Sequence, residues 1–324
     1  MNEKLQEIVN MFIGNLRVMV EKFPKVKGDS LLVAAAMAAR EGIAISEEKM
    51  ALYTDRVNAD GFLKKLTDDF RLFTVGKLLV HQESSSLITH IQNNYGYIDR
   101  VTDCTPKQVY LGSVTMSERF GTCSMEEADQ AFYVHRRLMS LNPFVLHNHD
   151  VYTCAVLAVA HEDPDKLIDD IQHIYDICKT MYPMHPEQAK YAASVMCMAP
   201  GDTPTRCKSI KPFLDAAKKA GKEYDVIEYG IALGLIPLLR IPMDEFIGLY
   251  SKADDMLTPL RIFGRGKKAE RMRRSYALIM AAIAALPYKD ENGTPFYRTQ
   301  DCFTGLWIAI FAFANIMSSR FRYM

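Results

Sequence analysis

Apolar residues recur at the spacing of an α-helix along almost the whole chain, and this periodicity constrains the fold more than any other feature. The first segment shows it on one helical face with Leu5, Ile8, Val9, Phe12 and Leu16. Alternation of apolar and polar residues over five or more positions, which indicates a half-buried strand, is hard to find. The sequence therefore predicts an all-α fold of roughly a dozen helices joined by short loops.

Helix start signals place the boundaries of these segments. A capping residue or a first-turn proline precedes periodic segments at Ser46, Asp68, Ser84, Pro106, Ser124, Pro164, Pro186 and Pro242. Short polar side chains can accept hydrogen bonds from the first amides of a helix, and proline suits its first turn. Two further helices are expected over 209–220 and 225–239. The segment 199–205, which reads APGDTPT, is predicted to be a loop.

The composition fits a globular protein and sets limits on its partners. The 324 residues are 49% hydrophobic and 24% charged, so there is ample apolar surface to bury and a disordered chain is excluded. Basic and acidic residues balance at 39 each, which leaves no global field toward nucleic acid or an anionic membrane.

The cysteines favour reduced thiols inside helices. There are seven, an odd number, and no CxxC pair occurs. The alternative is an exposed pair formed by Cys197 and Cys207, which flank the predicted loop.

The two ends of the chain give no sign of export. The N-terminal segment has early acidic residues and no continuous apolar core, unlike a signal peptide. The most apolar stretch, Leu306–Met317, has about 12 residues and is too short to cross a bilayer. We expect a cytoplasmic protein without a membrane span, whose C-terminal helix from about 301 caps the fold or docks on a second subunit as a homodimer. A membrane tail or interfacial anchor is the alternative for this stretch.

An internal similarity suggests a repeat. When residue 69 is placed over residue 149, the segment 69–116 lies over 149–196 without a gap and with nine identities in 48 positions. The matched residues include Tyr95 with Tyr175 and Pro106 with Pro186. We predict an irregular α-solenoid-like array of repeats of about 80 residues, continuous over 1–324. If it divides, we expect parts 1–199 and 206–324. The alternative is a globular domain whose helices merely look alike.

This order of elements resembles an uncharacterised family of bacterial all-helical proteins of about 320 residues, a domain of unknown function. The resemblance covers roughly 28–285. It rests on a helix, a second helix carrying the pattern of Leu87, Ile91 and Tyr95, a turn led by Pro106, and a small-residue helix that ends in Met116. The resemblance implies a helical fold and assigns no activity or catalytic residue.

A cluster of histidines and an acid is a candidate metal site. His147, His149 and Asp150 combine imidazole and carboxylate ligands that suit Zn, Fe, Mn or Ni. His135, on the preceding predicted helix, would lie near them in an antiparallel hairpin. The alternative is a helix cap with two solvated histidines, because no HExxH motif or cysteine ligand pair accompanies them.

A basic segment is the second candidate site. Five side chains are proposed to bind an anion: Arg261, Arg265, Lys267, Lys268 and Arg271. Gly264 and Gly266 let the backbone approach a ligand, and a helix is expected to begin near Lys267, where its first amides attract anions. The alternatives are a solvated basic loop, a nucleic-acid site and a surface for an acidic partner. Nucleic acid is disfavoured because only Phe263 is available to stack on a base.

The sequence offers no catalytic constellation. GxSxG, GxGxxG and kinase motifs are absent, and the adjacent acids Asp254 and Asp255 are expected to diverge by about 100° on a helix. We therefore expect a non-enzymatic scaffold without a cofactor that binds a protein or peptide. The alternatives are a binder of phosphate ligands or nucleic acid through 261–274, and a metal-dependent helical enzyme that uses His147 and His149.

Overall fold

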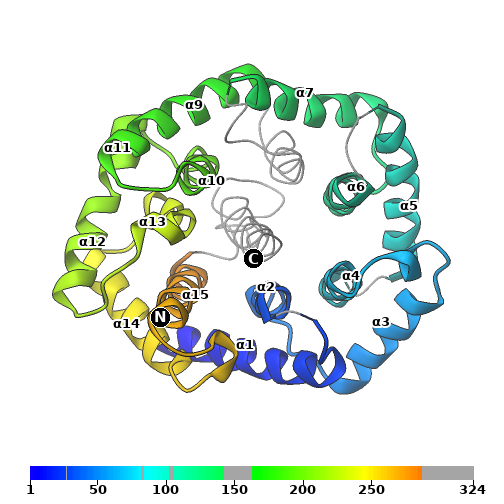
Figure 1. Cartoon of the computed structure of the whole chain (residues 1–324), viewed down its shortest axis with the longest axis horizontal. Helices are drawn as coiled ribbons and strands as arrows, with labels where there is room; N and C mark the ends of the chain where they lie inside the picture. Colours follow the sequence, from blue (N-terminus) through cyan, green and yellow to red (C-terminus); the bar gives the residue numbers. More distant parts are fainter. Residues whose placement is uncertain (27, 82–83, 102–105, 142–162, 287–324) are drawn as a thin grey trace. The chain divides into compact units, whose positions relative to one another are not determined.

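The computed structural model describes residues 1–26, 28–81, 84–101, 106–141 and 163–286 (Figure 1). Every regular element in these ranges is a helix, which confirms the all-α prediction. The described residues form two compact units: unit 1 contains 1–9 and 163–286, and unit 2 contains 10–141. The first helix contributes residues to both units.

Unit 2 is built mainly from long helices. Its elements, with the first helix included, are α1 (Asn2–Lys22), α2 (Gly28–Arg40), α3 (Glu47–Ala59), the 3₁₀ turn η1 (Leu63–Lys65), α4 (Asp68–His81), α5 (Ser84–Val101), α6 (Pro106–Phe120) and α7 (Met125–Leu141). Among them, α2 packs on α4, α3 packs on α4, and α5 packs on α6.

Unit 1 combines longer helices with several short ones. Its elements are α9 (Pro164–Met181), α10 (Pro186–Met196), α11 (Thr203–Lys208), α12 (Ile210–Lys219), α13 (Val226–Tyr229), the 3₁₀ helix η3 (Gly230–Leu238), α14 (Met243–Leu257), the 3₁₀ turn η4 (Arg261–Phe263) and α15 (Lys267–Ala285). Here α9 packs on α10, and α14 packs on α15.

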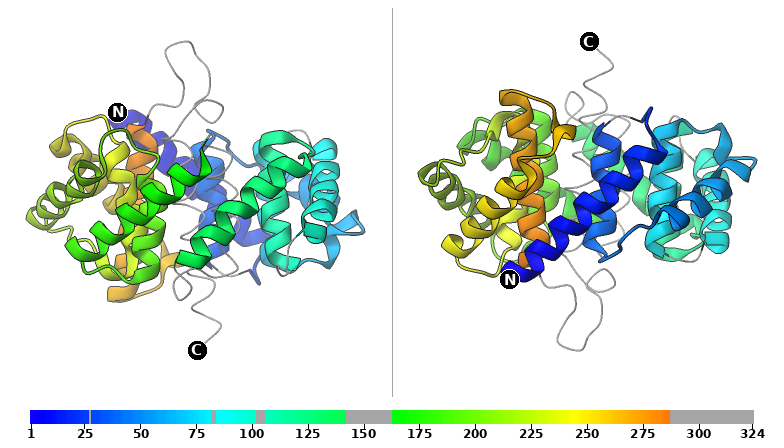
Figure 2. Two further views of the ribbon diagram at one scale, coloured as in Figure 1. Left: turned by 90° about the horizontal axis from the view of Figure 1, so that it is seen from above. Right: turned by 90° about the horizontal axis from the view of Figure 1, so that it is seen from below.

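Two kinds of helix make up both units. Residues 31–39 of α2, 188–196 of α10 and 276–284 of α15 are all buried, so these helices face no solvent over those spans. In α12, by contrast, only Ile210, Phe213 and Ala217 are buried, which is one amphipathic face. Within unit 1, Figure 1 views α10 and α15 end-on, and Figure 2 shows α15 along its length.

Two buried asparagines in unit 2 fix the backbone that follows α2 and α6. Asn15 of α1 donates to the carbonyl of Ile43 at 2.9 Å and accepts from the amide of Ile45 at 2.8 Å. Asn94 of α5 donates to the carbonyl of Gly121 and accepts from the amide of Cys123, both at 2.8 Å. Each side chain satisfies backbone groups that no helix pairs.

The predicted helix starts are confirmed where the caps are described. The Ser46 side chain accepts from the amide of Lys49. Ser124 and Glu127 form a reciprocal capping box, in which each backbone amide donates to the other side chain. Asp163 accepts from the amides of Asp165 and Lys166 ahead of α9.

Two local predictions are wrong. The predicted loop 199–205 contains the start of α11 at Thr203, because Asp202 caps the helix by accepting from the Thr205 amide at 2.8 Å. The single helix predicted over 225–239 is instead the short α13 followed by η3. Pro237 cannot donate a helical hydrogen bond, and the glycines in this segment allow a close approach to α10.

The remaining predictions fall partly outside the described residues. The metal cluster at 147–150 and the C-terminal helix with its expected dimer contact lie there. Within the described part of the chain, no helix combines the length and apolar character needed to cross a membrane. The loop 199–206, the expected division point of a divided chain, lies inside unit 1.

Replacing Gly234 with alanine is expected to destabilise the protein by about 2 kcal/mol. A Cβ built there would lie 2.8 Å from the carbonyl oxygen of Ala192 and 2.8 Å from the Cβ of Val195, so η3 would have to move away from α10. Gly248→Ala in α14 is the control, because nothing lies within 4 Å of its added Cβ. That variant is expected to be neutral or stabilised by about 0.5 kcal/mol. Urea unfolding of both variants measures the difference, and equal stabilities would contradict the prediction.

Candidate functional site

Five exposed basic side chains gather on one short stretch of unit 1, which we call the basic face: Arg261, Arg265, Lys267, Lys268 and Arg271. The first belongs to η4, the second lies between two glycines, and the last three lie in the first turns of α15. The structure thus places all five residues of the predicted anion site within one turn–helix junction. Residues 267–274 are helical, so the alternative of a basic loop is wrong for that part.

The junction has a defined backbone. Gly264 and Gly266 have φ angles of 88° and 84°, a region that residues with a Cβ rarely adopt. The Gly264 amide donates to the carbonyl of Arg261 at 2.9 Å, and Phe263 is buried against Tyr276 with ring centroids 5.7 Å apart. The chain therefore turns sharply from η4 into α15 on an apolar anchor, and the basic side chains point outward.

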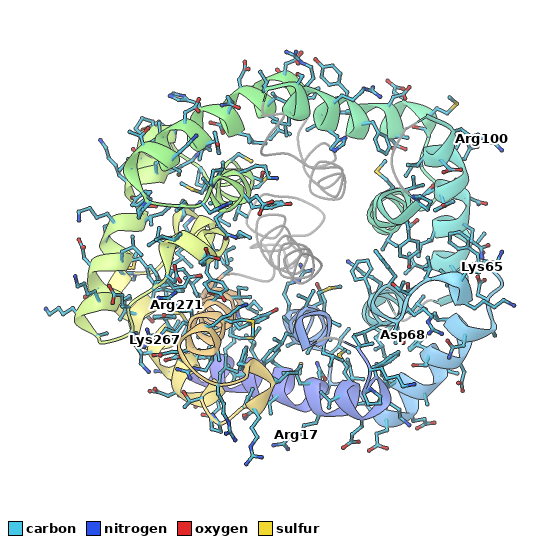
Figure 3. The ribbon with its side chains drawn as sticks, in the orientation of Figure 1. Arg17, Lys65, Asp68, Arg100, Lys267 and Arg271 are labelled. Carbon is cyan, nitrogen blue, oxygen red and sulfur yellow. The ribbon has the colours of Figure 1, made fainter. Side chains whose placement is uncertain are left out.

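The N-terminus of α15 adds to the positive field of the basic face. Gly266 is its cap residue and has no side chain to accept from the first amides. Helix N-termini carry a partial positive charge. Lys267 and Arg271, labelled in Figure 3, are four positions apart and so lie on the same side of the helix. Arg271 also forms an ion pair at 3.0 Å with Asp225, which precedes α13.

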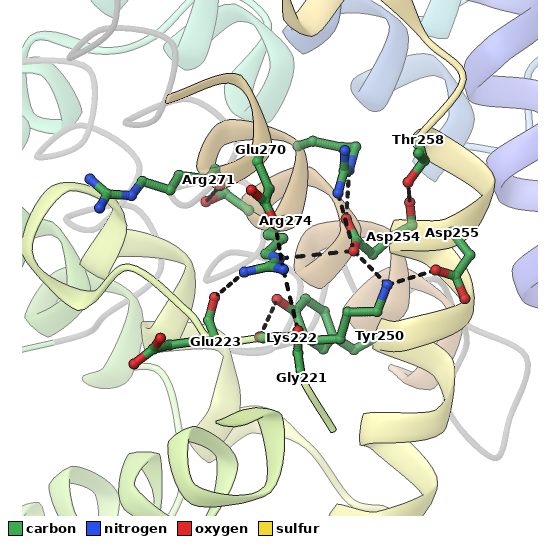
Figure 4. Close-up of polar contacts among 12 residues, drawn as sticks. Gly221, Lys222, Glu223, Tyr250, Asp254, Asp255, Thr258, Glu270, Arg271 and Arg274 are labelled. Atoms are coloured by element: carbon green, nitrogen blue, oxygen red, sulfur yellow. Dashed lines mark hydrogen bonds and ion pairs between the residues drawn. The ribbon is translucent and has the colours of Figure 1, made fainter. Parts of the chain in front are cut away.

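A buried carboxylate lies behind the basic face. Asp254 of α14 has a fully buried side chain and accepts hydrogen bonds from Lys222 Nζ at 2.8 Å and Arg273 Nε at 2.7 Å. The Arg274 guanidinium lies within 3.9 Å of the same carboxylate. Figure 4 shows Lys222 and Arg274 directed toward Asp254 while Arg271 extends away from it. The cations behind the basic face therefore point toward the buried Asp254, whereas the side chains of the basic face itself point toward solvent.

Further ion pairs and a hydrogen bond around Asp254 balance the charge of Lys222 and Arg274. Lys222 also binds Asp255 at 2.6 Å, and Arg274 binds Glu270 at 2.6 Å and the carbonyl of Glu223 at 2.7 Å. Asp254 and Asp255 diverge as expected, since the first side chain is fully buried and the second is 70% exposed, and the flexible Lys222 side chain reaches both. Three acids and three cations offset one another, so the cluster ties α15 and the 221–224 turn to α14.

The environment of Asp254 favours its charged form. Burial opposes ionisation and by itself raises the pKa, but hydrogen bonds from Arg273 and Lys222 outweigh burial and hold the pKa of Asp254 below its ordinary value of 3.8. For Lys222, burial lowers the pKa, but the bonds to Asp254 and Asp255 prevail and raise it above its ordinary value. Both groups are therefore charged at neutral pH and already paired, which suits a structural role.

Sequence reasoning missed Lys222, Asp225 and Asp254 as partners of the basic segment. The signal was weak, since a lysine in a turn and an acid on a helix are ordinary surface residues. The predicted metal ligands His147, His149 and Asp150 lie outside the described residues, so the structure does not place them. Elsewhere in the described ranges, no group of three His, Cys, Asp or Glu side chains is arranged to hold a metal ion.

Comparison with known proteins identifies no relative of this chain. Models of protein families, curated proteins and solved structures were each searched, and none matches the chain. The resemblance to a bacterial all-helical family therefore stays a prediction, and the function has to be argued from the residues.

Asp254→Asn is expected to lower the free energy of unfolding by about 3–5 kcal/mol, because it leaves three buried or half-buried cations without their shared anion. Asp255→Asn is the matched control: its side chain is 70% exposed and its ion pair with Lys222 is expected to contribute about 0.5 kcal/mol. Denaturant unfolding at pH 7 measures both values. A similar small loss in both variants would contradict the central role of Asp254.

The contribution of Asp254 is also expected to depend on pH. Because its folded-state pKa is lowered, this contribution is complete above the ordinary pKa of 3.8 and is lost as the pH falls through the folded-state value. Unfolding curves of the wild type and Asp254→Asn, measured from pH 7 down to pH 2.5, should converge at the acid end. A constant difference over this range would be inconsistent with an ionised Asp254.

Proposed function

We propose that this chain is a non-enzymatic helical-repeat protein that binds an acidic polypeptide segment through the basic face. The observation that carries the proposal is the set of five exposed basic side chains on a turn–helix junction that is anchored by the buried Phe263. The repeat and the partner are argued separately below.

The helix boundaries support the predicted repeat. Helices α5 and α9 begin at Ser84 and Pro164 and end at Val101 and Met181, so both boundaries differ by the same offset. Helices α6 and α10 begin with Pro106 and Pro186, which are again separated by that offset. Unrelated helices that merely look alike have no reason to share both boundaries and the start of the next helix.

The buried positions follow the same offset. In α5, the buried residues Leu87, Ile91, Asn94 and Ile98 correspond to the buried residues Leu167, Ile171, Ile174 and Cys178 of α9. The same face of each helix is therefore turned to the core although only two of the four pairs are identical.

The turns after α2, α6 and α10 extend the pattern to a third copy. Gly42, Gly121 and Gly201 follow α2, α6 and α10, and all three have positive φ angles. The turns in unit 2 are alike as well, since Asn15 and Asn94 each donate to a backbone carbonyl and accept from the amide two residues later, at Ile43 and Ile45 and at Gly121 and Cys123. These similarities support an α-solenoid-like repeat.

The chemistry of the basic face favours an extended acidic partner over a compact phosphate. Its side chains are exposed and spread over η4, the glycine turn and α15. A tight phosphate site would use converging, desolvated cations, but the buried cations here are already bound to Asp254. Carboxylates distributed along a peptide match such a spread of charges.

Nucleic acid is less well matched because bases need aromatic or planar side chains to stack on. Phe263, the aromatic residue within the segment, is buried against Tyr276 and unable to present its ring to a base. The phosphate and nucleic-acid alternatives therefore become outcomes of the binding test. The alternative function as a metal-dependent enzyme stays a prediction, because it depends on His147 and His149.

The double variant Arg265→Glu/Lys267→Glu is expected to weaken binding of a fluorescein-labelled polyglutamate peptide at least tenfold, because two attractive charges become repulsive. Fluorescence anisotropy at low salt measures the affinity, and raising the salt to about 150 mM should weaken wild-type binding as well. Lys64→Glu/Lys65→Glu in unit 2 makes the same change in net charge on side chains of η1 and should keep wild-type affinity.

Three results would overturn the proposal. The first is no peptide binding by the wild type at low salt. The second is equal loss of affinity in the control variant, which would indicate that net charge alone acts. The third is stronger binding of a labelled duplex DNA or of pyrophosphate at the basic face, which would favour one of the two alternatives.

A further inference from the structure

A cluster of sulfur atoms lies in the core of unit 1, apart from the basic face. Cys178 of α9, Cys207 of α11 and Met196 at the end of α10 are fully buried. The Cys178 Sγ lies 3.7 Å from Cys207 Sγ and 3.8 Å from Met196 Sδ. The alternative of an exposed pair between Cys197 and Cys207 is wrong, since both are buried and the thiol beside Cys207 is that of Cys178.

The surrounding bonds hold the two thiols face to face. Asp170 of α9 accepts from the Thr203 hydroxyl at 2.8 Å and from Arg206 at 2.5 Å, which fastens α11 to α9. The Tyr182 hydroxyl donates to the carbonyl of Cys207 at 2.7 Å. A disulfide has a sulfur–sulfur distance of about 2.05 Å, so the two sulfur atoms need to approach by about 1.7 Å.

The two thiols differ in acidity in a way that gives them separate roles. The hydrogen bond from Cys178 lowers the pKa of Cys207, an effect that outweighs burial and is aided by the Arg206 guanidinium. The same bond, together with burial, raises the pKa of Cys178. Cys207 is thus the more acidic thiol of the pair, and we assign it the first attack on an oxidant, with Cys178 as the resolving thiol.

Helix α11, which carries Cys207, is short enough to open locally. Helix α11 has six residues and is too short to be stable by itself. Asp170 attaches it to α9, and the cap residue Asp202 holds its first turn by accepting from the Thr205 amide and hydroxyl. Opening of this one element, without unfolding of α9 or α10, would admit a small oxidant to Cys207.

We propose that Cys178 and Cys207 are a redox modification site that forms a reversible disulfide on reaction with a hydroperoxide. The Cys207 thiolate attacks one peroxide oxygen, the O–O bond breaks, and Cys207 becomes a sulfenic acid as hydroxide leaves. The Cys178 sulfur then attacks the Cys207 sulfur, the S–O bond breaks, and the oxygen leaves as water with the Cys178 proton. Both sulfur atoms are oxidised by one electron each, and the peroxide is reduced by two. A small thiol reverses the bond by disulfide exchange.

The test is to treat the reduced, folded full chain with hydrogen peroxide and to analyse it by intact mass and peptide mapping without reductant. We expect a loss of the mass of two hydrogen atoms and a cross-linked peptide pair that joins Cys178 to Cys207. Dithiothreitol should restore the reduced mass. Stable addition of oxygen to Cys207 without the cross-link, a cross-link between other cysteines, or no reaction would each overturn the proposal.

Matched serine variants locate the reaction. Cys178→Ser and Cys207→Ser should each abolish the cross-link. Cys197→Ser should leave it unchanged, because the Cys197 thiol donates to the carbonyl of Ser194 and takes no part in the bond between the other two thiols. Circular dichroism confirms that each variant is folded, and the wild-type peptide map tests the proposal even if a variant unfolds.

The role of α11 in controlling access has its own test. Asp170→Asn weakens the attachment of α11 to α9 and should increase the rate of cross-linking about tenfold, because the open population of the helix rises. Asp215→Asn, an exposed change in α12 at the ion pair with Lys211, is the control and should leave the rate unchanged. Equal rates in the wild type and Asp170→Asn would refute control of access by α11.

Discussion

Helices that are apolar on every side place the strongest constraint on this structure, because each must be covered from all directions. Residues 276–284 of α15 include runs of alanine, leucine, isoleucine and methionine, and every one of them is buried. This span of α15 cannot lie at the surface of the unit, although the first turns of the helix do. The amphipathic α14, with one buried face that includes Phe246 and Tyr250, supplies one side of the cover and is positioned by that requirement.

The same constraint creates a problem for the backbone that leaves an all-buried helix. The chain has to turn near the core, where amides and carbonyls without partners are costly. In unit 2, Asn15 and Asn94 satisfy these groups from a neighbouring helix. In unit 1, the Gln188 side chain accepts from the amide of Ile231 at 3.2 Å, which anchors η3 on α10. A few buried amides therefore decide where the turns of an otherwise apolar core can lie.

Much of the helical pattern could be predicted from the sequence because its signals are local. A cap such as Ser124 with Glu127, or a proline at the first turn of α9, acts within a single helical turn. The errors arise where distant contacts decide. Gly234 lies in the 3₁₀ helix η3, where the predicted helix was a single continuous one, and it is packed closely against α10. No residue near Gly234 in the sequence signals that contact. Likewise, α11 depends on Asp170, which belongs to α9 and lies far from Thr203 in the sequence.

At the candidate site too, features set by neighbouring residues could be predicted from the sequence, whereas features set by distant contacts could not. The basic segment stands out from its composition, and the start of α15 at Lys267 follows from the glycines before it. Its outer and inner cations cannot be told apart from composition, because Arg271 and Arg273 belong to the same charged run. Only the position of Asp254 on the neighbouring α14 separates a side chain that holds the fold together from one that faces solvent.

This separation determines how the basic face can recognise a partner. The chain has a formal net charge of zero, so attraction over long distances is weak and recognition depends on the local field. At physiological salt that field reaches about 8 Å. Because Asp254, Asp255 and Glu270 already offset Lys222, Arg273 and Arg274, the buried cluster adds little to it. The field outside comes from the exposed residues and the α15 N-terminus, which allows surface charges to set partner preference without altering the network that stabilises the helix.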